Sequence, residues 1–249
     1  MEDFLKQQDA VIGNLEGPIT DNESVSINSQ IGEPRHFKFT FQPDWAQTLE
    51  DKNIRIVNLG NNHILNFGEA GFEKTQEYLE QSRVEWFGDV SAKICETGAD
   101  CPDKSLIKEL NGQRIGFVNF NQFTENSIMQ TLASIKQLRS DADVVIVYTH
   151  WGTEYQSVAG EKIKDLAHQF IDAGADSIIG THPHVVQNKE VYKGKTIYYS
   201  LGNFVFDQYF SPETKQGLGV QLMINPEGEI GYKDIKFELE TSGKTRAFN

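Results

Sequence analysis

Two histidines stand two positions apart in the segment "DSIIGTHPHVVQ", residues 176–187. A short apolar stretch precedes them, and Pro183 separates them. Proline fixes its own backbone φ and biases the preceding residue toward an extended shape. In an extended segment, residues two apart project to one side. We therefore expect His182 and His184 to point into one site.

Other polar side chains also follow predicted strands. In open α/β sheets, ligands bind in the crevice at the carboxyl ends of the strands. Four of the six histidines fall at such ends, with asparagines and carboxylates beside them. The residues concerned are Asn14, Glu16, Asn61, Asn62, His63, His150, Glu154, Tyr155, His182, His184, Asn203 and Asp207.

The chemistry of this set favours a divalent metal. Imidazole nitrogen, amide oxygen and carboxylate oxygen together suit Mn, Fe or Zn, whereas an all-oxygen set would indicate Mg or Ca. Taken singly, each segment is better explained by capping groups, turn formers or a hydrogen-bonded loop histidine. Because the segments recur at successive strand ends, we interpret them together as a site for one or two metal ions.

The elements that must position these residues alternate between strands and helices. Apolar runs and β-branched residues predict strands at 10–16, 54–60, 143–150, 176–180 and 195–204. Helical spacing predicts helices at 43–53, 69–83, 129–139 and 161–173, the last of which contains His168 as a surface or packed residue. Turn residues predict hairpins at Asn111–Gly112 and at 226–228, and a turn at Lys193–Gly194. This order predicts an α/β fold with a mixed sheet or two sheets.

Length and charge narrow the class of protein. The chain has 249 residues, enough for one large domain with a substantial core. Its 36 acidic and 23 basic residues give a net charge of −13, which repels nucleic acid, so no nucleic-acid partner is expected. No apolar run approaches the roughly 20 residues of a membrane span, and no signal peptide opens the sequence. Any export signal or anchor is therefore expected outside it.

Two cysteines, Cys95 and Cys101, flank a short polar segment that contains Gly98. A disulfide that closes this small loop is sterically plausible and would indicate an oxidising compartment. Two free thiols in a cytosolic loop are the alternative, because a single nearby pair is a weak signal.

The sequence resembles the poly-gamma-glutamate capsule biosynthesis protein CapA family, which belongs to the calcineurin-like metallophosphoesterase superfamily. The resemblance runs from Asp9 to Asp207. It rests on five segments in the family's order: "NLEGPIT", "NLGNNHILNFGEAGF", "THWGTEY", "GADSIIGTHPHVVQ" and "YSLGNFVFD".

The resemblance implies a four-layer α/β/β/α sandwich of two mixed β-sheets, formed by residues 1–249 as a single domain, with a two-metal centre at the strand ends. Glu16 matches a carboxylate that bridges the metals. Asn62 matches an amide ligand, and His63 a catalytic histidine. The remaining ligands would be His150, His182 and His184.

Two positions depart from the family's pattern. The family usually begins with a Gly-Asp strand whose aspartate is a metal ligand, and the residues before Glu16 contain no such strand. Either the sequence begins after that strand or the protein lacks it, and both alternatives weaken the first metal position. Asn66 also stands where the family often has an aspartate.

Two functions follow from these observations. The first is a metal-dependent hydrolase in poly-gamma-glutamate capsule synthesis or export, cleaving a phosphoester or an amide. His63 would protonate the leaving group. Substrate or the metal ligands would be held by Asn14, Asn61, Glu154, Tyr155, Asn203 and Asp207. The second is a non-catalytic polymer-binding or scaffold component with a degenerate metal site.

The expected partners are an anionic glutamate polymer or a phosphoester substrate, and a membrane synthase complex. The resemblance implies an extracellular or cell-surface location, with the cytoplasm as the alternative. A purely structural α/β domain would leave the clustered histidines unexplained.

Overall fold

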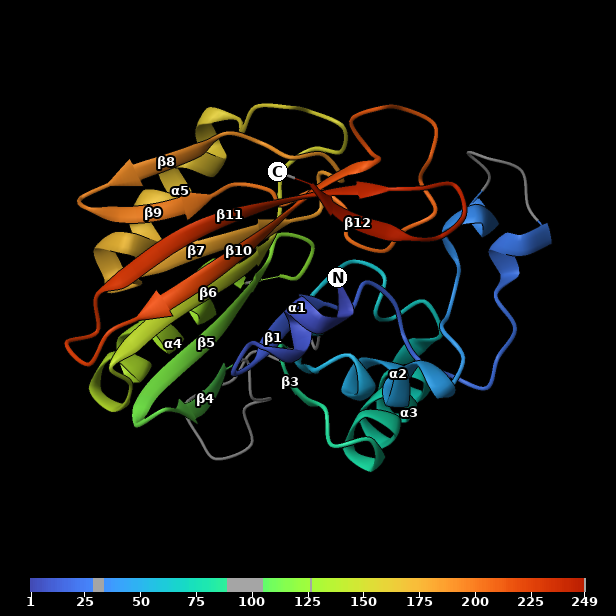
Figure 1. Ribbon diagram of the computed structural model, residues 1–249, viewed down its shortest axis with the longest axis horizontal. Coiled ribbons are helices and arrows are strands. Elements are labelled where there is room, and N and C mark those ends of the chain that lie inside the picture. The colour runs from blue at the N-terminus through green and yellow to red at the C-terminus, as the bar shows by residue number, and fades with distance from the viewer. Residues whose placement is uncertain (29–33, 89–104, 126, 249) are drawn as a thin grey trace. The chain divides into compact units, whose positions relative to one another are not determined.

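The computed structural model describes residues 1–28, 34–88, 105–125 and 127–248 (Figure 1). Its contacts divide the chain into two compact units. The N-terminal unit comprises residues 2–104 and 123–125, and the C-terminal unit comprises residues 105–122 and 126–249 with Met1. The expectation of a single domain stays a prediction. Cys95 and Cys101 lie outside the described residues.

The N-terminal unit contains a three-stranded parallel sheet in the order β1-β2-β3. The strands are β1 (Val11–Asn14), β2 (Ile54–Asn58) and β3 (Glu85–Phe87). The helices are α1 (Glu2–Lys6), η1 (Val25–Asn28), η2 (Pro34–Phe37), α2 (Asp44–Asp51) and α3 (Gly68–Gln81). Residues from β2, α2 and α3, including Val57, Ala46 and Leu79, form its buried core. Parallel strands need such crossover helices to connect them.

The C-terminal unit contains a six-stranded sheet in the order β4-β5-β6-β7-β9-β8. The strands are β4 (Ser105–Leu110), β5 (Gln113–Asn121), β6 (Val144–His150), β7 (Ser177–Thr181), β8 (Lys189–Tyr192) and β9 (Lys195–Tyr198). Neighbours from β5 to β9 are parallel, whereas β4 and β8 are antiparallel edge strands. The sheet is therefore mixed.

The two faces of this sheet are covered by different elements, as the neighbours Tyr198 and Tyr199 show. Tyr199 belongs to the core that packs against α4 (Ser127–Asp141) and α5 (Glu161–Ala173). The Tyr198 hydroxyl instead donates to Asp234 at 2.7 Å, on β11. Alternate residues of a strand face opposite sides. A second sheet, β10-β11-β12, thus covers the face opposite the helices (Figure 1). Its strands are β10 (Gln216–Ile224), β11 (Ile230–Leu239) and β12 (Thr245–Phe248).

The predicted α/β class with mixed sheets is confirmed. The hairpin turn at Asn111–Gly112 has φ values of 52° and 80°, as a turn with two left-handed residues requires. The strand expected at 195–204 is wrong in its length, because β9 ends at Tyr198. Three short strands, β3, β8 and β12, were not expected from the sequence.

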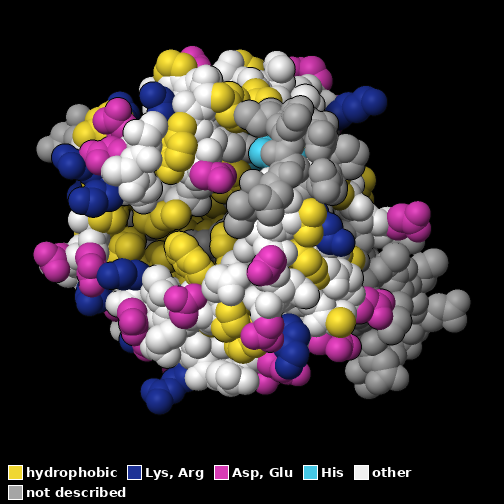
Figure 2. All heavy atoms as spheres, turned by 90° about the vertical axis from the view of Figure 1, so that its right-hand side faces the viewer, with side chains coloured by type: hydrophobic (Ala, Val, Ile, Leu, Met, Phe, Trp, Pro, Cys, Tyr) yellow, Lys and Arg dark blue, Asp and Glu magenta, His cyan; other side chains and the backbone are white. Residues whose placement is uncertain are grey.

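Acidic and basic side chains are interspersed on the face drawn in Figure 2, with no broad patch of one charge. Among the described residues, no helix combines the length and apolar character that a membrane crossing requires.

Candidate metal centre

The C-terminal unit gathers three histidines at the carboxyl ends of two adjacent parallel strands. His150 is the last residue of β6 and is paired in register with Thr181, the last residue of β7. His182 follows Thr181 directly, and His184 lies two residues further on. The register of β6 on β7 therefore brings the histidines of two sequence segments to one edge of the sheet.

Three side chains at this edge are close enough to share an ion. Glu154, His182 and His184 each offer one ligand atom, and these atoms lie within 4.8 Å of one another. The ring centroids of His150 and His182 are 4.8 Å apart, and those of His182 and His184 are 6.0 Å apart. All three histidines are buried. We call His150, Glu154, His182 and His184 the histidine cluster.

The backbone of the two neighbouring histidines differs from the expectation. His182 has a φ of 96° and His184 a φ of 59°, so the segment is not extended, and that prediction is wrong. Positive φ is uncommon outside glycine, and such strained residues concentrate at functional sites. The Pro183 carbonyl accepts a 2.8 Å hydrogen bond from the Tyr155 N–H, which helps to hold the turn.

Asn203 fixes the tautomer of His184. The Asn203 Nδ2 donates to the carbonyl oxygen of Thr214 at 2.9 Å, so its amide oxygen must face the other way. That oxygen lies 2.9 Å from His184 Nδ1 and can only accept. His184 therefore carries its proton on Nδ1 and its lone pair on Nε2, the arrangement in which a neutral imidazole binds a metal.

Thr181 imposes the same tautomer on His150. The Thr181 hydroxyl donates its single proton to the carbonyl oxygen of Thr149 at 2.8 Å. It must therefore accept from His150 Nδ1, which lies 3.0 Å away. Sequence reasoning did not identify Thr181, because a threonine that ends a buried strand carries no signal of such a role.

The neutral form of His184 is favoured further by its surroundings. Burial lowers the pKa of His184 below its ordinary value, and the hydrogen bond with Asn203 offsets only part of this effect. A metal ligand must be deprotonated. His182, His184 and the Glu154 carboxylate thus fit a divalent metal, and His150 lies beside His182 with its own Nε2 lone pair.

The N-terminal unit gathers a second group of predicted residues at the ends of β1 and β2. Asn14 Nδ2 donates to Glu16 Oε2 at 3.0 Å, and Asn14 Oδ1 accepts from Asn58 at 3.3 Å and Asn61 at 3.4 Å. Asn61 also donates to the Leu15 carbonyl at 2.8 Å. Sequence reasoning missed Asn58, whose signal is an asparagine that ends a β-branched strand. This amide network orients the Glu16 carboxylate.

His63 and Asn62 lie beside this network, on the loop after β2. The Asn61 Oδ1 accepts from the His63 backbone N–H at 3.1 Å, and the His63 ring packs 4.8 Å from the Phe39 ring. Asn62 is exposed, whereas Asn61 is buried. Asn66 donates to the carbonyls of Phe37 and Phe39 at 3.1 and 3.0 Å. An aspartate could not donate these bonds, which gives the departure at Asn66 a physical reason.

The remaining predicted residues also lie in the C-terminal unit. Tyr155 packs on the His184 ring, and Asp207 is exposed on the loop that follows Asn203. His168, expected to be a packed or surface residue, stacks 3.8 Å from the Tyr192 ring and lies 2.8 Å from Glu190 Oε1. The expectation of a packed or surface residue is confirmed.

Solved structures define the class of fold. A hypothetical protein from Thermus thermophilus has a TM-score of 0.59 and 16% identity, over 95% of this chain and 90% of its own. A novel phosphatase from Mycoplasma pneumoniae has a TM-score of 0.50 and 17% identity, over 99% and 87%. The chain thus shares an α/β fold with these two proteins.

Sequence comparison then gives the family. Residues 1–208 match the family model described as bacterial capsule synthesis protein PGA_cap, and the chain belongs to that family. The capsule biosynthesis protein CapA of Bacillus anthracis is 29% identical over 90% of this chain. The PGA biosynthesis protein CapA of Bacillus subtilis (strain 168) is 28% identical over 92%. The chain spans 57% and 61% of the lengths of these two relatives.

Proposed function

We propose that this chain is a metal-dependent hydrolase of capsule synthesis that cleaves a phosphoester or an amide. The observation that carries the proposal is the histidine cluster, in which Thr181 and Asn203 hold His150 and His184 in the metal-binding tautomer. A hydrogen bond of this kind alone does not mark a metal ligand, because His168 makes one to Glu190. The proposal also needs the proximity of buried histidines and a carboxylate, which His182, His184 and Glu154 provide.

In the histidine cluster, Glu154, His182 and His184 would hold a metal ion, and His150 would be a further ligand beside His182. A bound divalent metal lowers the pKa of water and polarises a phosphoryl or carbonyl oxygen. Glu16 and Asn62 are further ligands that the family resemblance implies. His63 would donate a proton to the leaving group, and Asn61 restrains the backbone that carries it.

The setting of the reaction is also part of the proposal. The names of the two Bacillus relatives, capsule biosynthesis protein CapA and PGA biosynthesis protein CapA, support a role in handling an anionic glutamate polymer. A cell-surface location and association with a membrane synthase complex would accompany that role.

Metal stoichiometry and turnover together test the proposal. Protein dialysed against metal-free buffer and reloaded with Mn would be measured by elemental mass spectrometry and assayed with bis-p-nitrophenyl phosphate. H182A should lose most of the bound metal and most of the turnover, because it removes a buried ligand. H168Q is the matched control in the same unit and should retain both.

A stoichiometry near zero for the wild-type protein would overturn the metal-dependent hydrolase and favour a polymer-binding or scaffold component. Bound metal that H182A does not reduce would show that the histidine cluster is not the site. Bound metal without turnover of phosphodiester or peptide amide substrates would contradict the hydrolase and leave a metal-binding module.

A further inference from the structure

Aromatic rings surround His184 in the C-terminal unit. The Tyr155 ring lies 6.1 Å from the His184 ring at an interplanar angle of 28°, and the Phe206 ring lies 4.9 Å away. Phe210 meets Tyr155 edge to face, with centroids 5.2 Å apart at 83°. Tyr155 and Phe210 are nevertheless 43% and 64% exposed. We call Tyr155, Phe206 and Phe210 the aromatic rim.

Tyr155 is restrained at both its backbone and its hydroxyl. Its N–H donates to the Pro183 carbonyl at 2.8 Å, and its hydroxyl accepts from Gln208 Nε2 at 3.3 Å. Its φ is 62°, in the left-handed region that residues with a side chain rarely adopt. A ring needed only for packing does not require a strained backbone, and strain of this kind concentrates at functional sites.

The restraint on Tyr155 leads back to the histidine cluster. Gln208 Oε1 accepts from Asn203 Nδ2 at 3.5 Å, and Asn203 Oδ1 accepts from His184 Nδ1 at 2.9 Å. A single chain of hydrogen bonds therefore positions the exposed Tyr155 ring and the His184 ring together. A molecule that places an anionic oxygen near His184 would bring its neighbouring group within reach of the rim.

We propose that the aromatic rim is a substrate subsite for a phosphoester that carries a ring, either an aromatic base or a sugar, beside its reacting phosphorus. The inference rests on the proposed function, since it assigns the phosphoryl group to the metal. Exposed aromatic faces bind rings through stacking and apolar contact. Because Tyr155 is already held in place, its ring loses little side-chain entropy on binding.

Phosphonates test the subsite without turnover, because their P–C bond replaces the cleavable ester bond. Binding of phenylphosphonate, cyclohexylphosphonate and methylphosphonate to the Mn-loaded protein would be measured by titration calorimetry. We expect the ring-bearing ligands to bind about fivefold tighter than methylphosphonate. Tighter binding of the phenyl compound would indicate an aromatic base, and tighter binding of the cyclohexyl compound a sugar.

Two single substitutions test whether the preference for ring-bearing ligands comes from the aromatic rim or from exposed apolar side chains in general. F210A should reduce the ring-to-methyl affinity ratio to near one, because it removes the most exposed ring. V205A changes a side chain that is 55% exposed on the same loop and should leave the ratio unchanged.

A wild-type protein without ring-dependent binding, or an F210A variant with the wild-type ratio, would overturn the subsite. Metal content measured on the same samples separates this failure from that of the proposed function. Bound metal without ring preference contradicts the subsite alone, whereas absence of metal contradicts the proposed function.

Discussion

His150 and His184 share one arrangement at the scale of single residues. In each, Nδ1 donates to a side-chain oxygen whose own residue is anchored to a backbone carbonyl. The tautomer and the ring orientation are therefore fixed without a metal. Such partners behind the ligands commonly raise metal affinity, because no ring has to reorient on binding.

Replacing Asn203 should weaken metal binding although Asn203 need not touch the metal. N203A removes the acceptor that holds the His184 proton on Nδ1. We expect a fall of about 10- to 100-fold in Mn affinity. Competition with a chromophoric chelator measures this affinity, and circular dichroism confirms that the variant is folded.

N225A is the matched control for this experiment. Asn225 also makes a side-chain hydrogen bond in the C-terminal unit, to Glu229 at 2.9 Å, but it is remote from the cluster in sequence and this bond is exposed to solvent. Its Mn affinity should equal that of the wild-type protein. An N203A variant that binds Mn as tightly as N225A would rule out the positioning role of Asn203.

The sequence allowed the residue types of this site to be predicted but not their geometry. The spacing of His182 and His184 predicted their proximity correctly, for the wrong reason. Proline bias favours an extended residue before it, whereas tertiary contacts impose positive φ at both histidines. Thr181 and Asn203 gain their roles only through strand register and a distant loop, which no local pattern reports.

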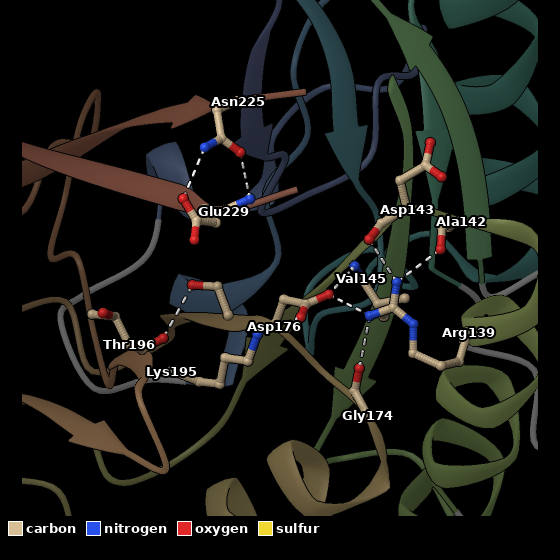
Figure 3. Close-up of polar contacts among 11 residues, drawn as sticks. Arg139, Ala142, Asp143, Val145, Gly174, Asp176, Lys195, Thr196, Asn225 and Glu229 are labelled. Carbon is tan, nitrogen blue, oxygen red and sulfur yellow. Dashed lines mark hydrogen bonds and ion pairs between the residues drawn. The ribbon is translucent and has the colours of Figure 1, made fainter. Parts of the chain in front are cut away.

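At the scale of elements, one partly buried ion cluster ties the helix α4 to the sheet, at the strand ends opposite the histidine cluster. Asp176, just before β7, accepts from the Val145 N–H at 2.9 Å and from Lys195 at 2.7 Å, and it pairs with Arg139 of α4. Arg139 also donates to the carbonyls of Ala142, Asp143 and Gly174 (Figure 3). The cluster thereby aligns the strands that carry the histidines.

Asp176 should make stability depend on pH in acid. Burial alone would raise the pKa of Asp176, but the bonds from Lys195, Val145 and Arg139 together lower it below its ordinary value. Its stabilisation is present above the unfolded pKa of about 3.9 and is lost as the pH falls through the lower folded pKa. D176N should therefore lower the free energy of unfolding by about 1–3 kcal/mol at neutral pH.

Urea titrations from pH 7 to pH 2.5 measure this difference. The difference in free energy of unfolding between the wild-type protein and D176N should be constant near neutral pH and shrink below about pH 4. D172N, which breaks the exposed pair with Lys193, should change stability by less than about 1 kcal/mol. If the difference in free energy of unfolding between wild type and D176N widened in acid, Asp176 would not have a lowered pKa in the folded protein.

The elements themselves were largely predictable, because long periodic segments dominate them. Helix α5 was expected at 161–173 and lies at Glu161–Ala173. The exceptions, such as β8 and β12, are four-residue strands. Their residues form strands because a neighbouring strand supplies the hydrogen-bond partners, so the local sequence carries little signal.

Charge acts at the scale of the whole molecule. The net charge of −13 opposes the approach of any polyanion, including the glutamate polymer proposed as a partner. Acidic side chains are distributed among basic ones on the face in Figure 2. Attraction to such a polymer would therefore depend on bound metal or on local contacts rather than on the overall field.

The salt dependence of polymer binding tests this argument. For metal-free protein, binding of fluorescently labelled poly-gamma-glutamate, followed by anisotropy, should be weakest at low salt and strengthen between about 20 and 200 mM NaCl, since screening over about 10 Å reduces the repulsion. Loading with Mn should raise the affinity at the low-salt end. Labelled dextran, which is uncharged, should show no salt dependence.

A basic binding surface would give the opposite dependence of affinity on salt, because salt then weakens the attraction. Polymer affinity that falls with salt in the metal-free protein would therefore show that a local cationic patch, rather than bound metal, recruits the polymer.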